Sequence, residues 1–299
     1  MKNLKKVFYS AKAAPYFFVC PFVLLFLIFF MFPVISTVKM SFQNIVPGSE
    51  AFVGLNNYKV IFSSDIYYTV LKNSFVYTVF ALILVIPIPM ILAVILNNKK
   101  VLFNNFIRSA LFVPTLTSVV VAGIIFRLIF GESPTALMNS ILSILGIGPL
   151  KWLQQYVPAY ICLEALTLWR WCGLNIVYFL SGLQSIPEEL YESASLDGAN
   201  SVQKFLYITF PMLKNITIYV LTISVYGGLA MFTESYIVFN GNSSPMNMGL
   251  TIVGYLYKEG LQQGRMGIGS AIGVSLLIIT LAVNLIQLCF TGFFKKEGR

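Results

Sequence analysis

Four of the eleven acidic residues of this 299-residue chain lie close together in a short polar segment, residues 186–213. They are Glu188, Glu189, Glu192 and Asp197, and long hydrophobic stretches flank the segment on both sides. Because those stretches are apolar enough to enter a bilayer, the segment between them must lie in water on one face of a membrane. A group of acids in so apolar a chain indicates a function for this segment.

Catalysis by these acids has little support in the rest of the sequence. The chain has no histidine, which removes the usual general base and metal ligand. Its four cysteines show no metal or redox spacing, and no G-x-x-x-x-G-K-[ST] phosphate loop is present. We therefore expect no catalytic residue, no metal and no cofactor in this chain. A membrane enzyme remains a rival interpretation, but the sequence offers few bases or nucleophiles for one.

Three further charged residues, Glu164, Arg170 and Glu234, fall within or near hydrophobic segments. An ionisable side chain at membrane depth is costly, so each is a candidate functional residue. Glu164 and Arg170 are six positions apart and do not share one helix face. Arg170 could instead pair with Glu234 as a structural ion pair. A proton relay is the alternative, and it would need more such groups than the chain has.

The composition places the chain in a membrane: 58% of its residues are hydrophobic, 10% are charged and the mean hydropathy is +0.82. Continuous apolar runs of about 20 residues predict spanning helices rather than strands. We expect an all-α polytopic protein with a single transmembrane domain, residues 1–299, and no second soluble domain. The six predicted spans are residues 16–42, 69–96, 106–130, 157–184, 213–239 and 266–293.

The distribution of lysine and arginine sets the expected orientation. Seven basic residues border the segments assigned outside: Lys39, Lys59, Lys72, Arg127, Lys151, Lys258 and Arg265. Twelve fall in those assigned inside: Lys2, Lys5, Lys6, Lys12, Lys99, Lys100, Arg108, Lys204, Lys214, Lys295, Lys296 and Arg299. Both termini and the polar segment 186–213 are therefore expected in the cytoplasm. The first apolar run exceeds a signal-peptide core and is read as a retained span.

The polar segment itself predicts two short helices. Pro187 suits a first helical position and the acids that follow complement the helix dipole, so residues 188–196 form the first helix. Asp197 and Gly198 form a turn, because glycine supplies the positive φ that ends a helix. Apolar residues at helical spacing predict a second helix that Pro211 ends. An amphipathic loop on the lipid surface is the alternative, but such loops are usually basic.

Prolines within the predicted spans indicate bends. Pro87 and Pro89 lie in the second span and Pro33 in the first. A proline is tolerated there because neighbouring helices can bond the carbonyl group that it leaves free. A hinge that opens a pathway and a static kink are equally compatible with the sequence.

The pattern Glu192-x-Ala194, Gly198 and Ile208-x-Phe210-Pro211 resembles the "EAA" loop of permease subunits in bacterial binding-protein-dependent ABC importers. Ser193 departs from the usual alanine. The similarity extends along nearly the whole chain and is closest to the carbohydrate-uptake, maltose-permease-like branch. Other matching positions are residues 52–58, Phe112-Val113-Pro114, Trp169-Arg170 with Gly173, residues 197–199, Phe205, Asn240-Gly241 to Pro245, and Gly267-x-Gly269-Ser270-Ala271.

The resemblance implies a type I importer permease with six transmembrane helices and a coupling loop at about 186–213. It implies a sister permease, two cytoplasmic ATPases that bind ATP and magnesium, and an extracytoplasmic solute-binding protein in a bacterial inner membrane. It also implies a carbohydrate substrate, with no role for nucleic acid. The residues expected to contact the ATPase are Glu192, Ala194, Asp197, Gly198 and Phe205. Phe205 could instead only pack the loop onto the helical bundle.

The resemblance also places a sugar site midway through the membrane. The matching positions are Thr115, Trp169, Ser224, Gly228 and Met231. Ordinary helix packing is the alternative for each of them, since small residues also allow close helix contact in lipid. An ion- or proton-coupled secondary transporter is the main rival function. It would show internal repeats and broken helices in corresponding halves, which the sequence does not display.

Overall fold

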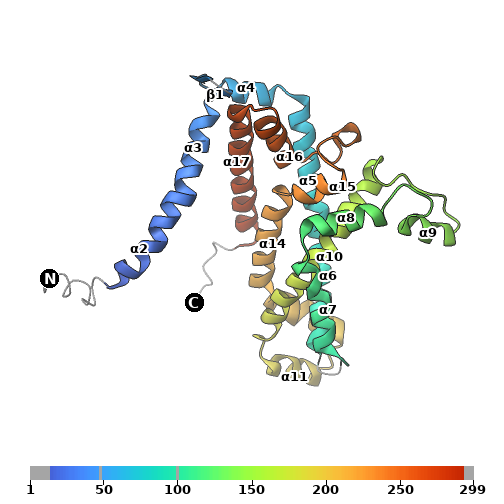
Figure 1. Ribbon diagram of the computed structural model, residues 1–299. Coiled ribbons are helices and arrows are strands. Elements are labelled where there is room, and N and C mark those ends of the chain that lie inside the picture. Colours follow the sequence, from blue (N-terminus) through green and yellow to red (C-terminus); the bar gives the residue numbers. More distant parts are fainter. Residues whose placement is uncertain (1–13, 47–48, 99–100, 293–299) are drawn as a thin grey trace, which may run out of the picture. The chain divides into compact units, whose positions relative to one another are not determined.

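The computed structural model describes residues 14–46, 49–98 and 101–292 (Figure 1). Within these ranges the chain is mainly helical, with one two-stranded antiparallel sheet. Several residues used to predict orientation lie outside the described ranges, so the topology of the termini stays a prediction. These are Lys2, Lys5, Lys6, Lys12, Lys99, Lys100, Lys295, Lys296 and Arg299.

The described residues form two compact units. The prediction of a single transmembrane domain for residues 1–299 stays a prediction. The described residues of the first unit are 14–46, 49–63 and 256–275. Its elements are α2 (Ala14–Phe26), η1 (Leu27–Met31), α3 (Phe32–Ser41), β1 (Gln43–Val46), β2 (Ser49–Phe52), α4 (Asn56–Phe62), η4 (Tyr257–Gln262) and the beginning of α17 (Met266–Phe290). Two compact units can both belong to one transmembrane domain, so this division does not test the prediction.

Close backbone approaches organise the first unit. The Asn57 side chain donates hydrogen bonds to the carbonyl oxygens of Ser41 and Gln43, at 2.9 and 2.8 Å, and so ties α4 to the end of α3. A Cβ atom at Gly267 would collide with the Gln43 carbonyl, and one at Gly269 would lie 2.6 Å from the Gly260 Cα. The glycine pair that opens the last predicted span is therefore required by packing.

The described residues of the second unit are 64–98, 101–255 and 276–292. Its long helices are α5 (Asp65–Val85), α6 (Pro87–Asn97), α7 (Asn104–Leu116), α8 (Val119–Ile129), α10 (Tyr156–Leu183) and α14 (Lys214–Leu229). The shorter ones are α9 (Leu137–Ile144), α11 (Glu188–Leu196), α12 (Ser201–Lys204), η2 (Phe205–Thr209), α13 (Phe210–Met212), α15 (Thr233–Val238), η3 (Pro245–Asn247) and α16 (Ile252–Leu256). The remainder of α17 also belongs here.

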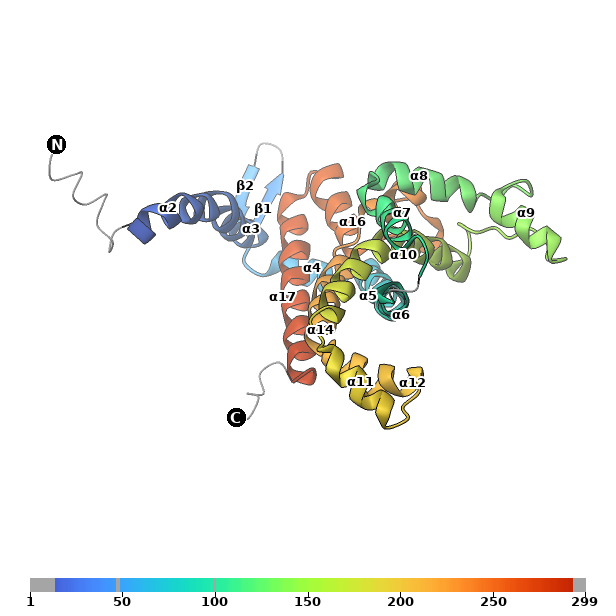
Figure 2. The same ribbon diagram turned by 90° about the horizontal axis from the view of Figure 1, so that it is seen from below.

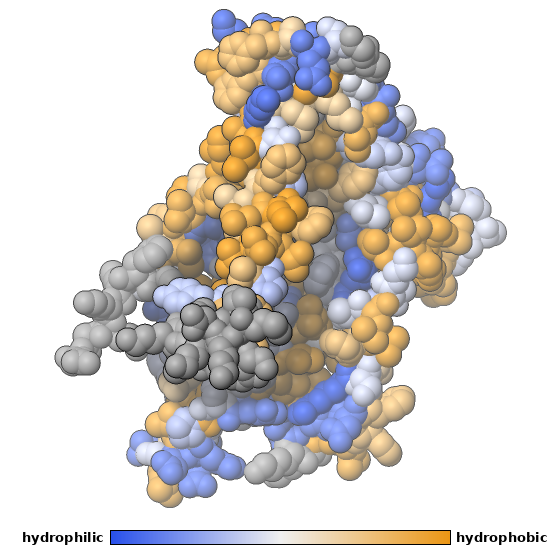
Figure 3. All heavy atoms as spheres, turned by 60° about the vertical axis from the view of Figure 1, so that its left-hand side comes forward, coloured by the Kyte–Doolittle hydropathy of each residue, from blue (hydrophilic) through white to orange (hydrophobic). Residues whose placement is uncertain are grey.

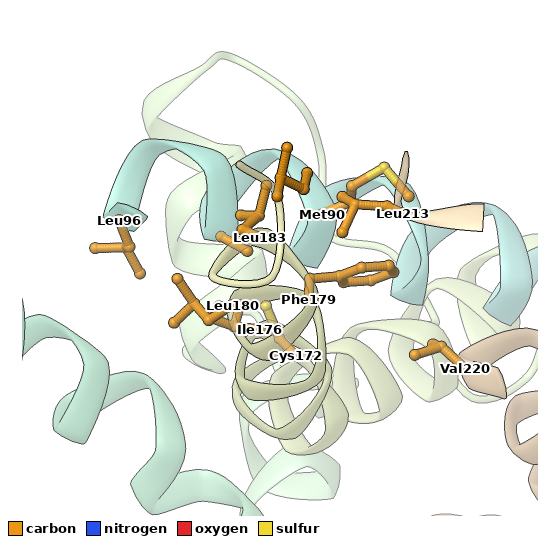
Figure 4. Close-up of a cluster of buried hydrophobic side chains, with 11 residues drawn as sticks. Met90, Leu96, Cys172, Ile176, Phe179, Leu180, Leu183, Leu213 and Val220 are labelled. Carbon is orange, nitrogen blue, oxygen red and sulfur yellow. The ribbon is translucent and has the colours of Figure 1, made fainter. Parts of the chain in front are cut away.

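Helix α10 is the centre of the second unit, and α5, α6, α7 and α14 all pack against it. One buried cluster joins Cys172, Ile176 and Phe179 of α10 to Met90 of α6 and Leu213 at the beginning of α14 (Figure 4). Elsewhere hydrophobic side chains make up much of the visible surface (Figure 3). Apolar residues exposed on long helices are expected where acyl chains replace water.

Three helical stretches are long and apolar enough to cross a membrane: Pro15–Ser41, Asp65–Asn97 and Met266–Phe290. Two bent pairs also qualify when each is taken as one span, Asn104–Leu116 with Val119–Ile129 and Ser201–Met212 with Lys214–Leu229. Helix α10 has 28 residues, but its polar side chains lower its hydropathy. The helical membrane fold is confirmed, and the count of six spans stays a prediction.

Two predicted spans differ from the structure because they are broken. The predicted span 106–130 bends by 99° between α7 and α8, at Thr117 and Ser118. The predicted span 213–239 is interrupted at residues 230–232, between α14 and α15. We expected neither break, although Pro114 and the polar residues Thr117 and Ser118 lie at the first one. The second break, at residues 230–232, contributes to the lining of the cavity described below.

Candidate functional site

The polar segment 186–213, hereafter the knob, forms two short helices as expected. Helix α11 begins after Pro187 and ends at Leu196. Gly198 has φ of +79°, and its N–H donates to the Ser195 carbonyl while the Ala199 N–H donates to that of Ala194. These two bonds form a Schellman C-cap, which requires a left-handed residue at the glycine position. The spacing from Ala194 to Gly198 is therefore fixed by helix termination.

The second helix of the knob is longer than predicted. It begins with a capping box between Asn200 and Gln203, which sequence reasoning missed although the Asn-x-x-Gln spacing could have revealed it. It then passes through the π-helical turn η2 and continues beyond Pro211 to Met212. Pro211 therefore lies inside the final turn, and the chain bends by 67° before α14.

The two knob helices lie side by side beyond the end of α10 (Figure 2). The Tyr191 hydroxyl is 2.9 Å from the Thr209 hydroxyl, and the Lys204 ammonium donates to the Ser195 hydroxyl at 2.5 Å. Tyr191 also packs against the buried cluster around α10. These contacts hold the knob as one body on the end of the bundle.

The residues expected to couple to an ATPase occupy different positions on the knob. Glu192, Asp197 and Gly198 are exposed, whereas Ala194 is half-buried. Phe205 is also half-buried and packs against the core cluster, which favours the packing role that was its alternative. The most exposed apolar side chains are instead Leu196, at 91%, and Tyr207, at 78%. Sequence reasoning did not single out either of them as a contact.

A cavity of about 440 Å³ lies among α5, α10, α14 and the break before α15. Its polar lining includes Tyr77, Thr167, Asn175, Ser224, Thr233 and Glu234, and its aromatic lining includes Trp171, Tyr226 and Phe232. Pockets with aromatic faces and a few convergent polar groups are typical small-molecule sites. Aromatic faces can pack against the apolar faces of a sugar ring, and hydroxyl or amide groups can hydrogen-bond its hydroxyls.

Three of the five residues predicted for a sugar site line this cavity: Ser224, Gly228 and Met231. Gly228 also has a packing role, since a Cβ there would lie 2.7 Å from the Thr78 hydroxyl of α5. The other two, Thr115 and Trp169, do not line it. The Thr115 hydroxyl donates to the Arg170 carbonyl at 2.8 Å, and the Trp169 ring lies 5.6 Å from that of Phe126.

Arg170 and Glu234 form the ion pair that the sequence suggested. The guanidinium Nη1 donates to a Glu234 carboxylate oxygen at 2.9 Å, and both side chains are mostly buried, with exposures of 14% and 16%. The guanidinium carbon also lies 5.7 Å from the centroid of the Trp171 ring. Because Glu234 and Trp171 line the cavity, the pair fixes the position of two lining residues and joins α10 to α15.

Comparison with curated proteins finds relatives over nearly the full length of the chain. It is 54% identical to the arabinooligosaccharides transport system permease protein AraP of Bacillus subtilis, covering 98% of this chain and 93% of that protein. It is 47% identical to AraP of Halalkalibacterium halodurans, covering 97% and 91%. It is also 27% identical to the trehalose/maltose transport system permease protein MalF of Thermococcus litoralis, covering 98% of each chain.

The fold is similar to that of a solved bacterial ABC transporter described as involved in the import of the acidic polysaccharide alginate. The TM-score is 0.85 over 99% of both chains, at 23% sequence identity. The family model of the inner membrane component of binding-protein-dependent transport systems matches residues 85–295, which include the knob and every lining residue named above except Tyr77. This chain therefore belongs to the family of inner membrane components of binding-protein-dependent transport systems.

Proposed function

We propose that this chain is one of the two membrane-spanning subunits of an ATP-driven importer for short arabinose-containing oligosaccharides. The observation that carries this proposal is the pair of relatives, 54% and 47% identical over nearly their whole length, that are named for arabinooligosaccharide transport. Family membership makes the chain a transport component rather than an enzyme. The aromatic and polar lining of the 440 Å³ cavity supports a sugar as the cargo.

The knob would be the contact through which ATP hydrolysis by a cytoplasmic ATPase drives transport. Glu192 offers an exposed carboxylate to a basic group of a cytoplasmic ATPase, while exposed Leu196 and Tyr207 supply apolar contact. Asp197 and Gly198 shape the end of α11, and Ala194 provides the carbonyl that closes its cap. Phe205 holds the second helix on the bundle. This division of roles agrees with two ATPases docking on the cytoplasmic face, where both chain termini would also lie.

An external binding protein would deliver the sugar to the cavity, which would lie on a transport path shared with a second permease subunit. Ser224 and Met231 would contact it beside Trp171 and Asn175, with Gly228 allowing the close approach of α14 to α5 that shapes this wall. Thr115 and Trp169 would act indirectly, through Arg170 and Phe126. A solved relative of this fold is described in complex with an alginate pentasaccharide-bound periplasmic protein, which supports delivery of the substrate by such a protein.

The test is uptake of labelled arabinotriose by the complete transporter in proteoliposomes, with maltotriose and lactose as competitors. We expect uptake that needs ATP and the binding protein, survives a protonophore and is competed best by arabinooligosaccharides. Uptake driven by a proton gradient without ATP would instead establish the secondary-transporter alternative. Preference for maltotriose would overturn the substrate assignment while leaving the ATP-driven mechanism intact.

A further inference from the structure

Glu164 is the charged group of α10 that neither the cavity nor the knob uses. Its side chain is buried, with 6% exposure for the residue, and neither carboxylate oxygen has a hydrogen-bond partner among the described residues. A buried carboxylate without a partner is costly, and more so at membrane depth. A hydrogen-bond donor from beyond the described residues would remove this cost.

Two tyrosine hydroxyls, those of Tyr77 and Tyr160, interact electrostatically with this carboxylate. Both already donate hydrogen bonds to other acceptors. The Tyr160 hydroxyl donates to the Asn73 carbonyl at 3.3 Å. The Tyr77 hydroxyl is bonded to that of Thr167, whose own proton goes to the Leu163 carbonyl at 2.9 Å, so Tyr77 must be the donor in its bond. Neither tyrosine can serve the carboxylate without breaking a bond that it already makes.

Glu164 is a lining residue of a pocket of about 510 Å³ between α5 and α10, and its two carboxylate oxygens are buried within the pocket wall. The only lining residues with polar side-chain atoms are Glu164, Tyr156 and Tyr160, and the other side chains that line it are hydrocarbon. The rim is open: Ile83 of α5 is 58% exposed, and Val157 and Ile161 of α10 are 71% and 49% exposed. The pocket thus combines an apolar wall with one unpartnered acid.

We propose that this pocket receives a basic side chain from a transmembrane helix of the second permease subunit. Lysine and arginine carry long apolar stems that would fill the pocket while their heads reach the carboxylate. Glu164 is the ninth residue of α10, about 12 Å along the helix at 1.5 Å per residue. That depth favours a side chain from a membrane helix over a lipid headgroup amine, which stays near the interface. The proposal rests on the two-permease assembly of the proposed function.

The first experiment leaves Glu164 in place. A photo-crosslinking amino acid is introduced at Ile83 or Ile161 in the complete transporter, and at Leu128, an exposed residue of α8 outside the pocket, to measure background. We expect the two rim positions to crosslink to the second permease, at a peptide that contains lysine or arginine. Adducts with lipid alone, or with a peptide lacking both residues, would overturn the proposal.

The second experiment removes the charge. Glu164→Leu should lower recovery of the second permease with this chain by about tenfold, whereas Glu164→Gln, which keeps hydrogen-bonding capacity, should lower it less. Neutralising the mapped basic residue as well should restore assembly with Glu164→Leu, because no unpaired charge remains. Unchanged recovery in both single variants would show that the acid needs no partner. Sugar specificity is measured separately with the unmodified transporter, so its failure would not affect these outcomes.

Discussion

The side-chain amide of Asn175 donates a hydrogen bond over 2.8 Å to the backbone carbonyl oxygen of Val85. Val85 ends α5, and the residue four positions later is Pro89, which has no N–H to offer that carbonyl. Helix α10 therefore supplies the donor that α6 lacks. A bond of this kind favours a fixed kink over a hinge at Pro87 and Pro89.

Replacing Asn175 with leucine should destabilise the subunit, because the Val85 carbonyl loses its donor. We expect the free energy of unfolding to fall by about 1–2 kcal/mol. Adding Pro89→Ala supplies a backbone N–H for the same carbonyl and should recover most of the loss. Thermal unfolding of the purified single and double variants measures both effects. If Pro89→Ala brings no recovery, the two groups do not share one acceptor.

Separating Arg170 from Glu234 should cost more than removing both charges. Arg170→Met or Glu234→Gln alone leaves a mostly buried charge unpaired, which costs about 3–5 kcal/mol. The double variant should be closer to the unmodified protein than either single variant. A double-mutant cycle on unfolding provides the measurement, and strictly additive effects would mean that the pair contributes no coupling energy.

Gly198→Ala should impair the knob through backbone strain alone. A Cβ at this position meets nothing within 4 Å, but the left-handed φ of +79° costs an L-residue about 1–2 kcal/mol. ATP-driven uptake should fall by about fivefold to thirtyfold with normal membrane insertion. Gly198→Asn should be milder, since asparagine tolerates this region.

Gly148→Ala is the matched control for this strain. Gly148 also has open space around it, and its φ lies outside the left-handed region. Full uptake with Gly148→Ala and reduced uptake with Gly198→Ala would isolate the conformational effect. Equal uptake by both variants would remove the glycine turn from the coupling mechanism.

Glu192→Ala should uncouple ATP hydrolysis from transport. The side chain is exposed, so its loss should leave the fold intact while removing a contact with the ATPase. We expect uptake to fall at least about tenfold, equivalent to about 1.4 kcal/mol. Glu50→Ala, an exposed acid of β2, is the control. Uptake and co-purification of the ATPase are measured together, and normal values for both would exclude a coupling role for Glu192.

The two tryptophans that flank Arg170 should behave differently. Trp171 lines the cavity, whereas Trp169 lies against Phe126. Trp171→Ala should raise the half-saturating sugar concentration by about tenfold, or about 1.4 kcal/mol. Trp169→Ala should lower stability with a smaller effect on that concentration. Concentration series of sugar uptake distinguish the two, and the reverse order would place the sugar elsewhere.

The knob was predictable from sequence because its signals are local. Pro187 begins α11 and Gly198 ends it, and both are consequences of backbone chemistry within a few residues. The break at Thr117 and Ser118 was not predictable in this way. Pro114 lies three residues before the bend, but a proline at this position is compatible with a kinked continuous helix as well as with a 99° break, so the local sequence does not decide between them.

The residues that line the cavity could not all be predicted from the sequence either. Motif similarity selected Trp169 and Thr115, but only the helix rotation decides which side chains face inward. On α10 that rotation turns Thr167, Trp171 and Asn175 toward the cavity, at a spacing of four residues. The spacing was visible in the sequence, whereas the face that meets the cavity depends on how α5 and α14 pack against it.

The backbones of α7 and α10 touch at Gly173, where a Cβ atom would collide with the Leu111 carbonyl group. Helix α10 then continues unbroken to Leu183, four residues before Pro187 and the start of α11. Helix α10 is about 42 Å long at 1.5 Å per residue, and its part from Thr167 to Leu183, about 24 Å, connects the cavity wall to the end that carries the knob. Under the proposed function, we expect movement of the knob to tilt α10 and α7 together, because their backbones are in contact at Gly173. The cavity would change shape through rigid rotation of its walls, with no helix having to melt.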